Sequence, residues 1–175
     1  MINLTKVSFG GASAIVTSLG LIVGAAAAQT SRAALLEALL IVALADNLTD
    51  ALGIHIYQES EKLEAQHAFA ATIGNFATRL ATCGTFLLLL TALPDSYTVS
   101  GSVAWGLSLL GGLTWLVARD RGANPITEVG KHLAIALLVI AMSVGIGAII
   151  HDIAFNTPLE LPWDVSPNAP PTARD

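Results

Sequence analysis

Two aspartates, Asp46 and Asp50, lie near the middle of a largely apolar stretch, residues 33–57, that is long enough to cross a bilayer. An ionisable side chain at that depth costs at least about 2.5 kcal/mol, so it normally faces a partner, a cavity or a transport path. Carboxylate oxygens are hard ligands that coordinate divalent cations, and they also relay protons. These two residues are therefore the first candidates for a cation or proton path.

The next apolar stretch of the sequence supplies a partner for these carboxylates. If the two stretches form a hairpin with its tip near Lys62, Asp46 lies 16 residues before the tip and Arg79 lies 17 after it. Both residues are then about 24 Å along their helices. Because an unpaired Arg is costly in a bilayer and its forked charge fits a carboxylate, we expect an ion pair between Asp46 and Arg79. The same count places Asp50 opposite Asn75. Further polar side chains expected in this network are those of Asp50, Asn47, Thr78 and Thr82.

A second group of candidate ligands lies at the expected tip of the hairpin. His55 and Glu59 are four residues apart, and Glu64 and His67 are three apart, so each pair shares one helix face. Imidazole and carboxylate together suit iron, manganese or zinc. An ordinary solvated helix end is the alternative interpretation. The candidate metal ligands of the chain are Asp46, Asp50, Glu59, Glu61, Glu64 and His67.

The composition is that of a membrane protein. Of the 175 residues, 54% are hydrophobic and only 12% are charged, whereas a soluble domain has about a quarter of its residues charged. Five apolar runs predict an all-α integral membrane bundle of five transmembrane helices over residues 1–155, and residues 156–175 form a proline-rich tail expected to be disordered. The net charge of -5 offers no field that would attract nucleic acid. The single Cys83 excludes an intrachain disulfide, and we expect it to pack in the apolar interior. The five spans are residues 7–28, 33–57, 69–93, 99–118 and 133–153.

The basic residues predict how the bundle is oriented. Five Lys and Arg side chains lie on one side of the spans and two on the other, which places the N-terminus in the cytoplasm and the tail outside or in a lumen, with the cell membrane as the expected location. A cleaved signal peptide is a competing interpretation of the first span, because Lys6 precedes an apolar run that ends in four alanines.

Small residues recur along one face of the first span. Gly20, Gly24 and Ala28 are four residues apart, a spacing that lets transmembrane helices approach closely. We therefore expect a homodimer through the first helix, and a helix that is merely rich in alanine is the alternative.

Three stretches of the sequence share a pattern with known membrane proteins. Residues 8–24, SFGGASAIVTSLGLIVG, come first, residues 45–62 contain ADNLTDALGI and end in ESEK, and residues 133–147 end in Gly-Ile-Gly. Together they resemble the first, second and last helices of the vacuolar iron transporter family, which carries ferrous iron or manganese out of the cytosol. The resemblance implies five spans with a cytoplasmic N-terminus, a dimer packed through the first helix, and acidic residues along the ion path.

The chain departs from that family at several ligand positions. The family has an Asp in the first helix just before the position matched by Ile15, where residues 12–14 here read Ala-Ser-Ala. It has a Met where this chain has Ile54, and a Glu where this chain has Gln58. The cytoplasmic metal-binding helices that some members insert between the second and third spans are absent from this sequence. The resemblance therefore implies the fold and only part of the ligand set.

Two functions are consistent with these residues. The first is export of a divalent metal, Fe²⁺ or Mn²⁺, across the lipid bilayer, with the ion as cargo and no tightly bound cofactor. The second is a non-transporting membrane scaffold or partner subunit, in which an Asp-Arg network replaces the metal site. An enzyme is not expected, because the sequence has no nucleophile and base at useful spacing, no phosphate loop and no metal-hydrolase signature.

Overall fold

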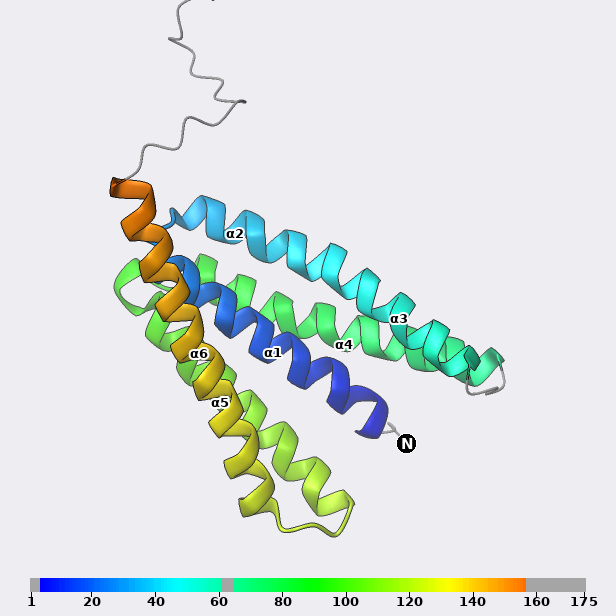
Figure 1. Ribbon diagram of the computed structural model, residues 1–175. Helices are drawn as coiled ribbons and strands as arrows, with labels where there is room; N and C mark the ends of the chain where they lie inside the picture. The colour runs from blue at the N-terminus through cyan, green and yellow to red at the C-terminus, as the bar shows by residue number, and fades with distance from the viewer. Residues whose placement is uncertain (1–3, 61–64, 157–175) are drawn as a thin grey trace, which may run out of the picture.

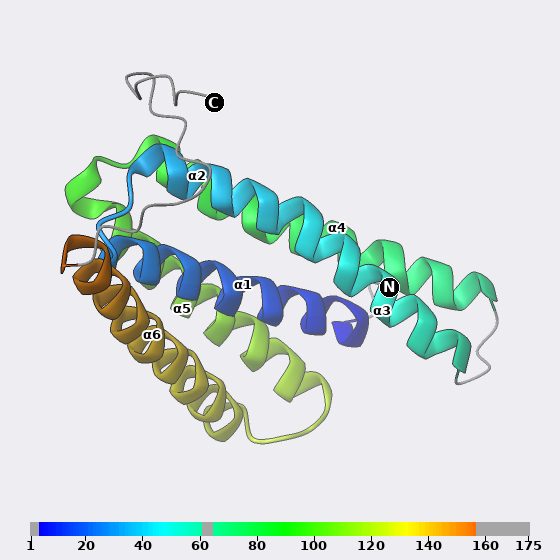
Figure 2. The ribbon, with the colours of Figure 1, turned by 45° about the horizontal axis from the view of Figure 1, so that its top comes forward.

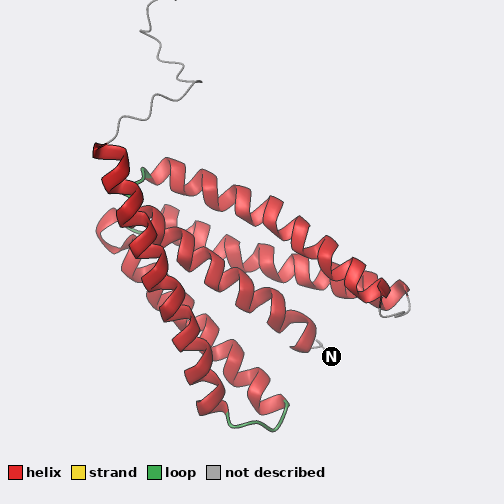
Figure 3. Ribbon diagram, in the orientation of Figure 1, coloured by secondary structure: helices red, strands yellow, loops and turns green. Residues whose placement is uncertain are grey.

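A computed structural model of the chain describes residues 4–60 and 65–156, and this part is built of helices without a strand (Figure 3). A π turn, η1, joins α2 to α3 without a break, so that three elements form one long helix. The described chain is thus an all-α bundle of five helices, as predicted. In order, the elements are α1 (Leu4–Ala27), α2 (Arg32–Ile41), η1 (Val42–Asp46), α3 (Asn47–Ser60), α4 (Ala65–Ala92), α5 (Asp95–Asp120) and α6 (Pro125–Asn156).

Helix α1 lies between two helical hairpins, and it contacts α4, α5 and α6 along its length (Figures 1 and 2). The first hairpin pairs the α2–η1–α3 helix with α4, and the second pairs α5 with α6. The two hairpins diverge toward the first turns of α1 (Figure 1).

The apolar core lies in the part of the bundle where the hairpins converge on α1. Leu19 and Ile22 of α1 are fully buried against Phe86 and Leu90 of α4 and Leu110 of α5. Burial of side chains of this size stabilises a fold by about 1.5–3 kcal/mol each in water, and in a bilayer their close packing takes over that role. This core holds α2 and the middle of α5 in place.

The ends of the hairpins are fixed by polar contacts that the sequence encodes. Arg32 at the start of α2 forms an ion pair of 2.6 Å with Asp95 of α5 and donates to the carbonyl of Leu93 at 2.8 Å, so it closes the end of α4. The side chain of Asn124 accepts from the backbone N–H of Ile126 at 3.1 Å, which caps the start of α6 just before its first-turn proline.

The small residues of α1 pack against α6 of the same chain. A Cβ added to Gly20 or Gly24 would come within 3.2 Å of Ser143, and one added to Gly147 would lie 2.2 Å from the carbonyl oxygen of Gly24. The predicted close approach of the first helix is therefore present, but its partner is α6. A homodimer through the first helix stays a prediction, and this glycine face is already occupied within the chain.

Four helices, α1, α4, α5 and α6, are long and apolar enough to cross a membrane. The second predicted span is not among them, because its α-helical pieces are only 10 and 14 residues long on either side of the π turn and it contains Asp46 and Asp50. It is nevertheless helical throughout and runs beside α4 (Figure 1). The predicted membrane bundle is thus confirmed; the described helices begin before the predicted spans, and α1 and α4 end one residue before theirs. The tail prediction falls almost wholly on residues outside the described part.

Candidate functional site

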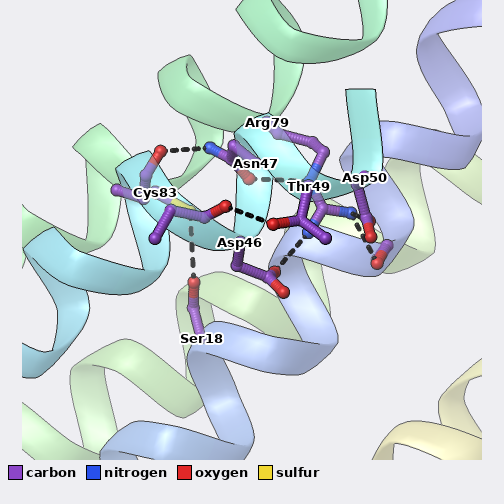
Figure 4. Close-up of polar contacts among 10 residues, drawn as sticks. Ser18, Asp46, Asn47, Thr49, Asp50, Arg79 and Cys83 are labelled. Atoms are coloured by element: carbon purple, nitrogen blue, oxygen red, sulfur yellow. Dashed lines mark hydrogen bonds and ion pairs between the residues drawn. The ribbon is translucent and has the colours of Figure 1, made fainter. Parts of the chain in front are cut away.

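Arg79 of α4 is the centre of the polar cluster between α1, α3 and α4. Its side chain is 1% exposed, and its guanidinium donates to side chains from two other helices (Figure 4). Nε donates to Oδ1 of Asn47 at 2.7 Å, Nη1 to Oγ of Ser13 at 2.7 Å, and Nη2 to Oδ2 of Asp46 at 2.6 Å. Nη1 also forms an ion pair with Oδ2 of Asp50. One buried cation therefore joins three helices.

The two aspartates approach Arg79 from the same side of the second helix. They are four residues apart, so their side chains stack one turn above the other. Asp46 is 43% exposed and Asp50 is 36% exposed, although the guanidinium between them is buried. The ion pair predicted between Asp46 and Arg79 is confirmed. Asp50, which was expected in the same network, forms an ion pair with this guanidinium, whereas no hydrogen bond joins it to Asn75 among the described residues.

A π turn positions the acidic residues. Val42–Asp46 forms the wide turn, and Asn47 follows it with its side chain fully buried. The amide of Asn47 donates to the carbonyl of Ala43 inside the turn at 2.6 Å while its oxygen accepts from Arg79. Asn47 thus ties the irregular backbone to the cation, which is consistent with the frequent occurrence of π turns at functional sites.

Small side chains let the three helices come close enough for these contacts. Ala14 of α1, Ala43 of η1 and Cys83 of α4 form a buried cluster next to the polar group. Cys83 is 1% exposed and its sulfur lies 3.7 Å from Oγ of Ser18 (Figure 4). The prediction that Cys83 packs in the interior is confirmed.

Asn75 is buried beside the cluster without joining it. Its side chain lies against α1, where a Cβ on Gly10 would be 2.3 Å from Oδ1. It is 2% exposed, and among the described residues neither Nδ2 nor Oδ1 has a hydrogen-bond partner. Of the predicted structural polar network, Asn47 and Arg79 therefore form the bonded part, and Asn75 lies one turn away on α4.

The expected contributions of Thr78 and Thr82 to the network were wrong. Thr78 donates to the carbonyl of Gly74 at 2.8 Å, and Thr82 donates to that of Thr78 at 2.8 Å. Hydroxyls in apolar helices commonly bond to the carbonyl four residues earlier, because no water competes for them. Both threonines therefore satisfy their own helix.

Sequence reasoning did not identify Ser13 as a member of the site. It lies on α1, and its hydroxyl accepts a hydrogen bond from Nη1 of Arg79 at 2.7 Å. A lone serine in an alanine-rich helix gives no signal by itself.

The second set of predicted ligands cannot be placed. The side chains of Glu59, Glu61, Glu64 and His67 lie outside the described residues, while His55 lies on α3 and is partly buried. Among the side chains that the structure describes, no group of three or more His, Cys, Asp or Glu is arranged to hold a metal ion. The carboxylate pair at Arg79 is therefore the site that the described chain offers.

The charge of this cluster limits what it can bind. Asp46 and Asp50 contribute two negative charges and Arg79 one positive charge, so the ionised cluster carries a net charge of −1. A divalent cation would overcompensate this charge unless Arg79 moved away from at least one carboxylate. A cation path through the cluster therefore requires the guanidinium to exchange partners.

No family model, curated protein or solved structure matches this chain.

Proposed function

We propose that the chain is a membrane transporter of divalent cations of the ferrous iron or manganese class, which moves the ion out of the cytosol. The observation that carries this proposal is the pair of partly exposed carboxylates, Asp46 and Asp50, held by the buried Arg79 inside a bundle of apolar helices. Acidic groups at such a depth mark ion pathways, and carboxylate oxygens are suitable ligands for manganese and ferrous iron. The resemblance of residues 8–24, 45–62 and 133–147 to iron transporters supports the choice of ion.

In this proposal Arg79 is an internal counter-ion that holds the carboxylates when no metal is bound. An entering cation takes one or both carboxylates, and the guanidinium withdraws from them. Two neutral acceptors, Oδ1 of Asn47 and Oγ of Ser13, already bind Arg79. Because these bonds can persist when a carboxylate leaves, the guanidinium keeps part of its hydrogen bonding, and the energy required for the exchange is reduced.

Access to the carboxylates is consistent with this exchange. Asp46 and Asp50 expose 43% and 36% of their side chains, so an ion can reach their outer oxygens before Arg79 moves. A divalent ion that replaced the guanidinium at both carboxylates would be neutralised by them. Release on the other side would then be driven by the return of Arg79.

A non-transporting scaffold is the second candidate, and one observation favours it. Arg79 is almost completely buried and has four partners, which is the arrangement of a static clamp between α1, α3 and α4. In that case the Asp-Arg cluster replaces a metal site and serves only helix packing. Partner proteins would then be recognised elsewhere on the bundle.

Flux of Mn²⁺ or Fe²⁺ into proteoliposomes containing the purified chain tests the proposal. We expect flux from the unaltered protein and a loss of at least tenfold in Asp50→Asn, because an amide is a weaker ligand without charge. Glu37→Gln is the matched control, since Glu37 is an exposed carboxylate on α2 of the same long helix. Folded protein without flux of either ion would support the scaffold, and equal loss in both variants would remove Asp50 from the path.

A further inference from the structure

A second candidate site lies between α1 and the α5–α6 hairpin, and it adjoins the Arg79 cluster, because Ser13 both lines this pocket and binds Arg79. A pocket of about 570 Å³ is enclosed by the first half of α1, the last turns of α5 and the first turns of α6. Its wall is largely apolar. The apolar wall includes Phe9, Ala12, Val16, Leu113, Val117 and Ile135.

Charged side chains gather at one end of this pocket. Arg121, Glu128 and His132 all line it, and Lys131 lies beside Glu128. Lys131 binds Oε1 of Glu128 at 2.9 Å, whereas Nη2 of Arg121 is 3.7 Å from Oε2, which is longer than a hydrogen bond. Arg121 is 58% exposed. Two full positive charges and a histidine thus surround one carboxylate that is already bonded to Lys131.

The pocket has the depth of one bilayer leaflet. Leu110 and Arg121, the two ends of its lining on α5, are 11 residues apart, or about 16 Å along a helix. Half of the hydrocarbon core of a bilayer is about 15 Å thick. When the α5–α6 hairpin spans the membrane, Arg121 lies at the level of the headgroups and the apolar wall lies among the acyl chains.

We propose that this pocket binds one anionic phospholipid, with an acyl chain along the apolar wall and the phosphate at Arg121. The guanidinium of Arg matches phosphate with two parallel hydrogen bonds. Basic pockets between transmembrane helices on the cytoplasmic side commonly bind acidic lipid headgroups, and the basic residues place this end of the bundle in the cytoplasm. A zwitterionic lipid offers the same acyl chain, but its headgroup brings a positive charge to the charged end of the pocket, where positive charges already outnumber negative ones.

Native mass spectrometry of the purified chain, without added metal, tests this inference with phosphatidylglycerol against phosphatidylcholine of the same chain length. We expect phosphatidylglycerol to be retained preferentially and Arg121→Gln to reduce its retention about fivefold, since one basic side chain near a membrane surface contributes about that factor. Arg119→Gln is the matched control, because Arg119 is an exposed cation on the same helix end that does not line the pocket.

A substitution that is expected to raise lipid retention provides an independent test. Glu128→Gln removes the carboxylate that competes for Lys131 and Arg121, so retention of phosphatidylglycerol should rise. Equal retention of the two lipids, or equal loss in Arg121→Gln and Arg119→Gln, would overturn the inference. A shift from dimer to monomer in Arg121→Gln with unchanged lipid retention would instead assign the pocket to a contact between two copies. Asp50→Asn should retain the lipid normally, which separates this site from the proposed transport path.

Discussion

Arg79 of α4 donates from Nη2 to Oδ2 of Asp46 at 2.6 Å across the contact with the π turn of the second helix. The guanidinium is buried and the carboxylate is partly exposed, so loss of the contact leaves the two groups with different surroundings to interact with. Asp46 keeps part of its side chain outside the helix contact, whereas Arg79 depends on its remaining acceptors. The contact therefore stabilises the arrangement of α1, α3 and α4 mainly because it pairs the buried charge of Arg79.

The coupling of this pair is the first prediction. Arg79→Gln should lower the free energy of unfolding by about 3 kcal/mol, because it leaves two carboxylates facing each other. Asp46→Asn should cost less, about 1 kcal/mol, since Asp50, Asn47 and Ser13 still bind the guanidinium. The double variant should recover about 1 kcal/mol or more relative to the sum of the single changes. Reversible unfolding in mixed micelles measures all three values.

A second set of single and double variants, with Glu37→Gln in place of Asp46→Asn, controls this measurement. Glu37 is exposed on α2 and lies nine residues from Asp46, so its effect should add to that of Arg79→Gln without coupling. Coupling of the same size in both cycles would mean that a general charge effect, and no specific contact, links Arg79 to the second helix.

Asn47 is predicted to matter more than its neighbour Thr49. Asn47→Ala removes the acceptor of Arg79 Nε and the donor to the carbonyl of Ala43, and unsatisfied buried groups cost about 1–3 kcal/mol. Thr49→Ala also removes a side-chain donor to the π turn, at the carbonyl of Ala45, but this bond is exposed. Its effect should stay within about 0.5 kcal/mol. The same unfolding assay compares them, and equal effects would argue against a structural role of Asn47 in the turn.

The contact between α1 and α6 yields a third prediction from two glycines of one helix. Gly147→Ala places a methyl group 2.2 Å from the carbonyl oxygen of Gly24, so the helices must separate, at a cost of about 1–3 kcal/mol. Gly145→Ala meets nothing within 4 Å and should be neutral or stabilising by up to about 1 kcal/mol. Melting temperatures in detergent test the difference. A harmless Gly147→Ala would show that this interface is looser than described.

The sequence predicted those contacts of the site that follow from the depth of two residues along the helices of the hairpin. Counting from the hairpin tip placed Asp46 and Arg79 at one level, and the cost of an unpaired Arg made their contact the expected outcome. The same count placed Asp50 level with Asn75, and although Asp50 was expected in the network, depth does not give the direction of a side chain around its helix and so did not predict its direct ion pair with Arg79. The two terminal nitrogens of the guanidinium reach both carboxylates, one turn apart.

Other features depended on contacts between helices and had no local signal. The π turn is held by the bond from Asn47 to Ala43 and is joined to α4 by the bond from Arg79 to Asn47. The glycines of the first helix were recognised as a packing face, but small residues serve contacts within a chain and between chains equally well. Their partner, α6, could be identified only from the structure.

Ser13→Asp is the prediction that bears most directly on transport. Oγ of Ser13 lies 2.7 Å from Nη1 of Arg79, so a carboxylate there would join Asp46 and Asp50 around the guanidinium. The ionised cluster would change from a net charge of −1 to −2 and could neutralise a divalent cation while Arg79 stays in place. Because affinity for divalent cations rises with the number of charged ligands, the apparent KM for Mn²⁺ flux should fall about tenfold. Ser13→Asn, of the same size without the charge, is the control and should leave the KM nearly unchanged. If the two variants behave alike, the cation does not approach Arg79, and the cluster acts as a helix clamp.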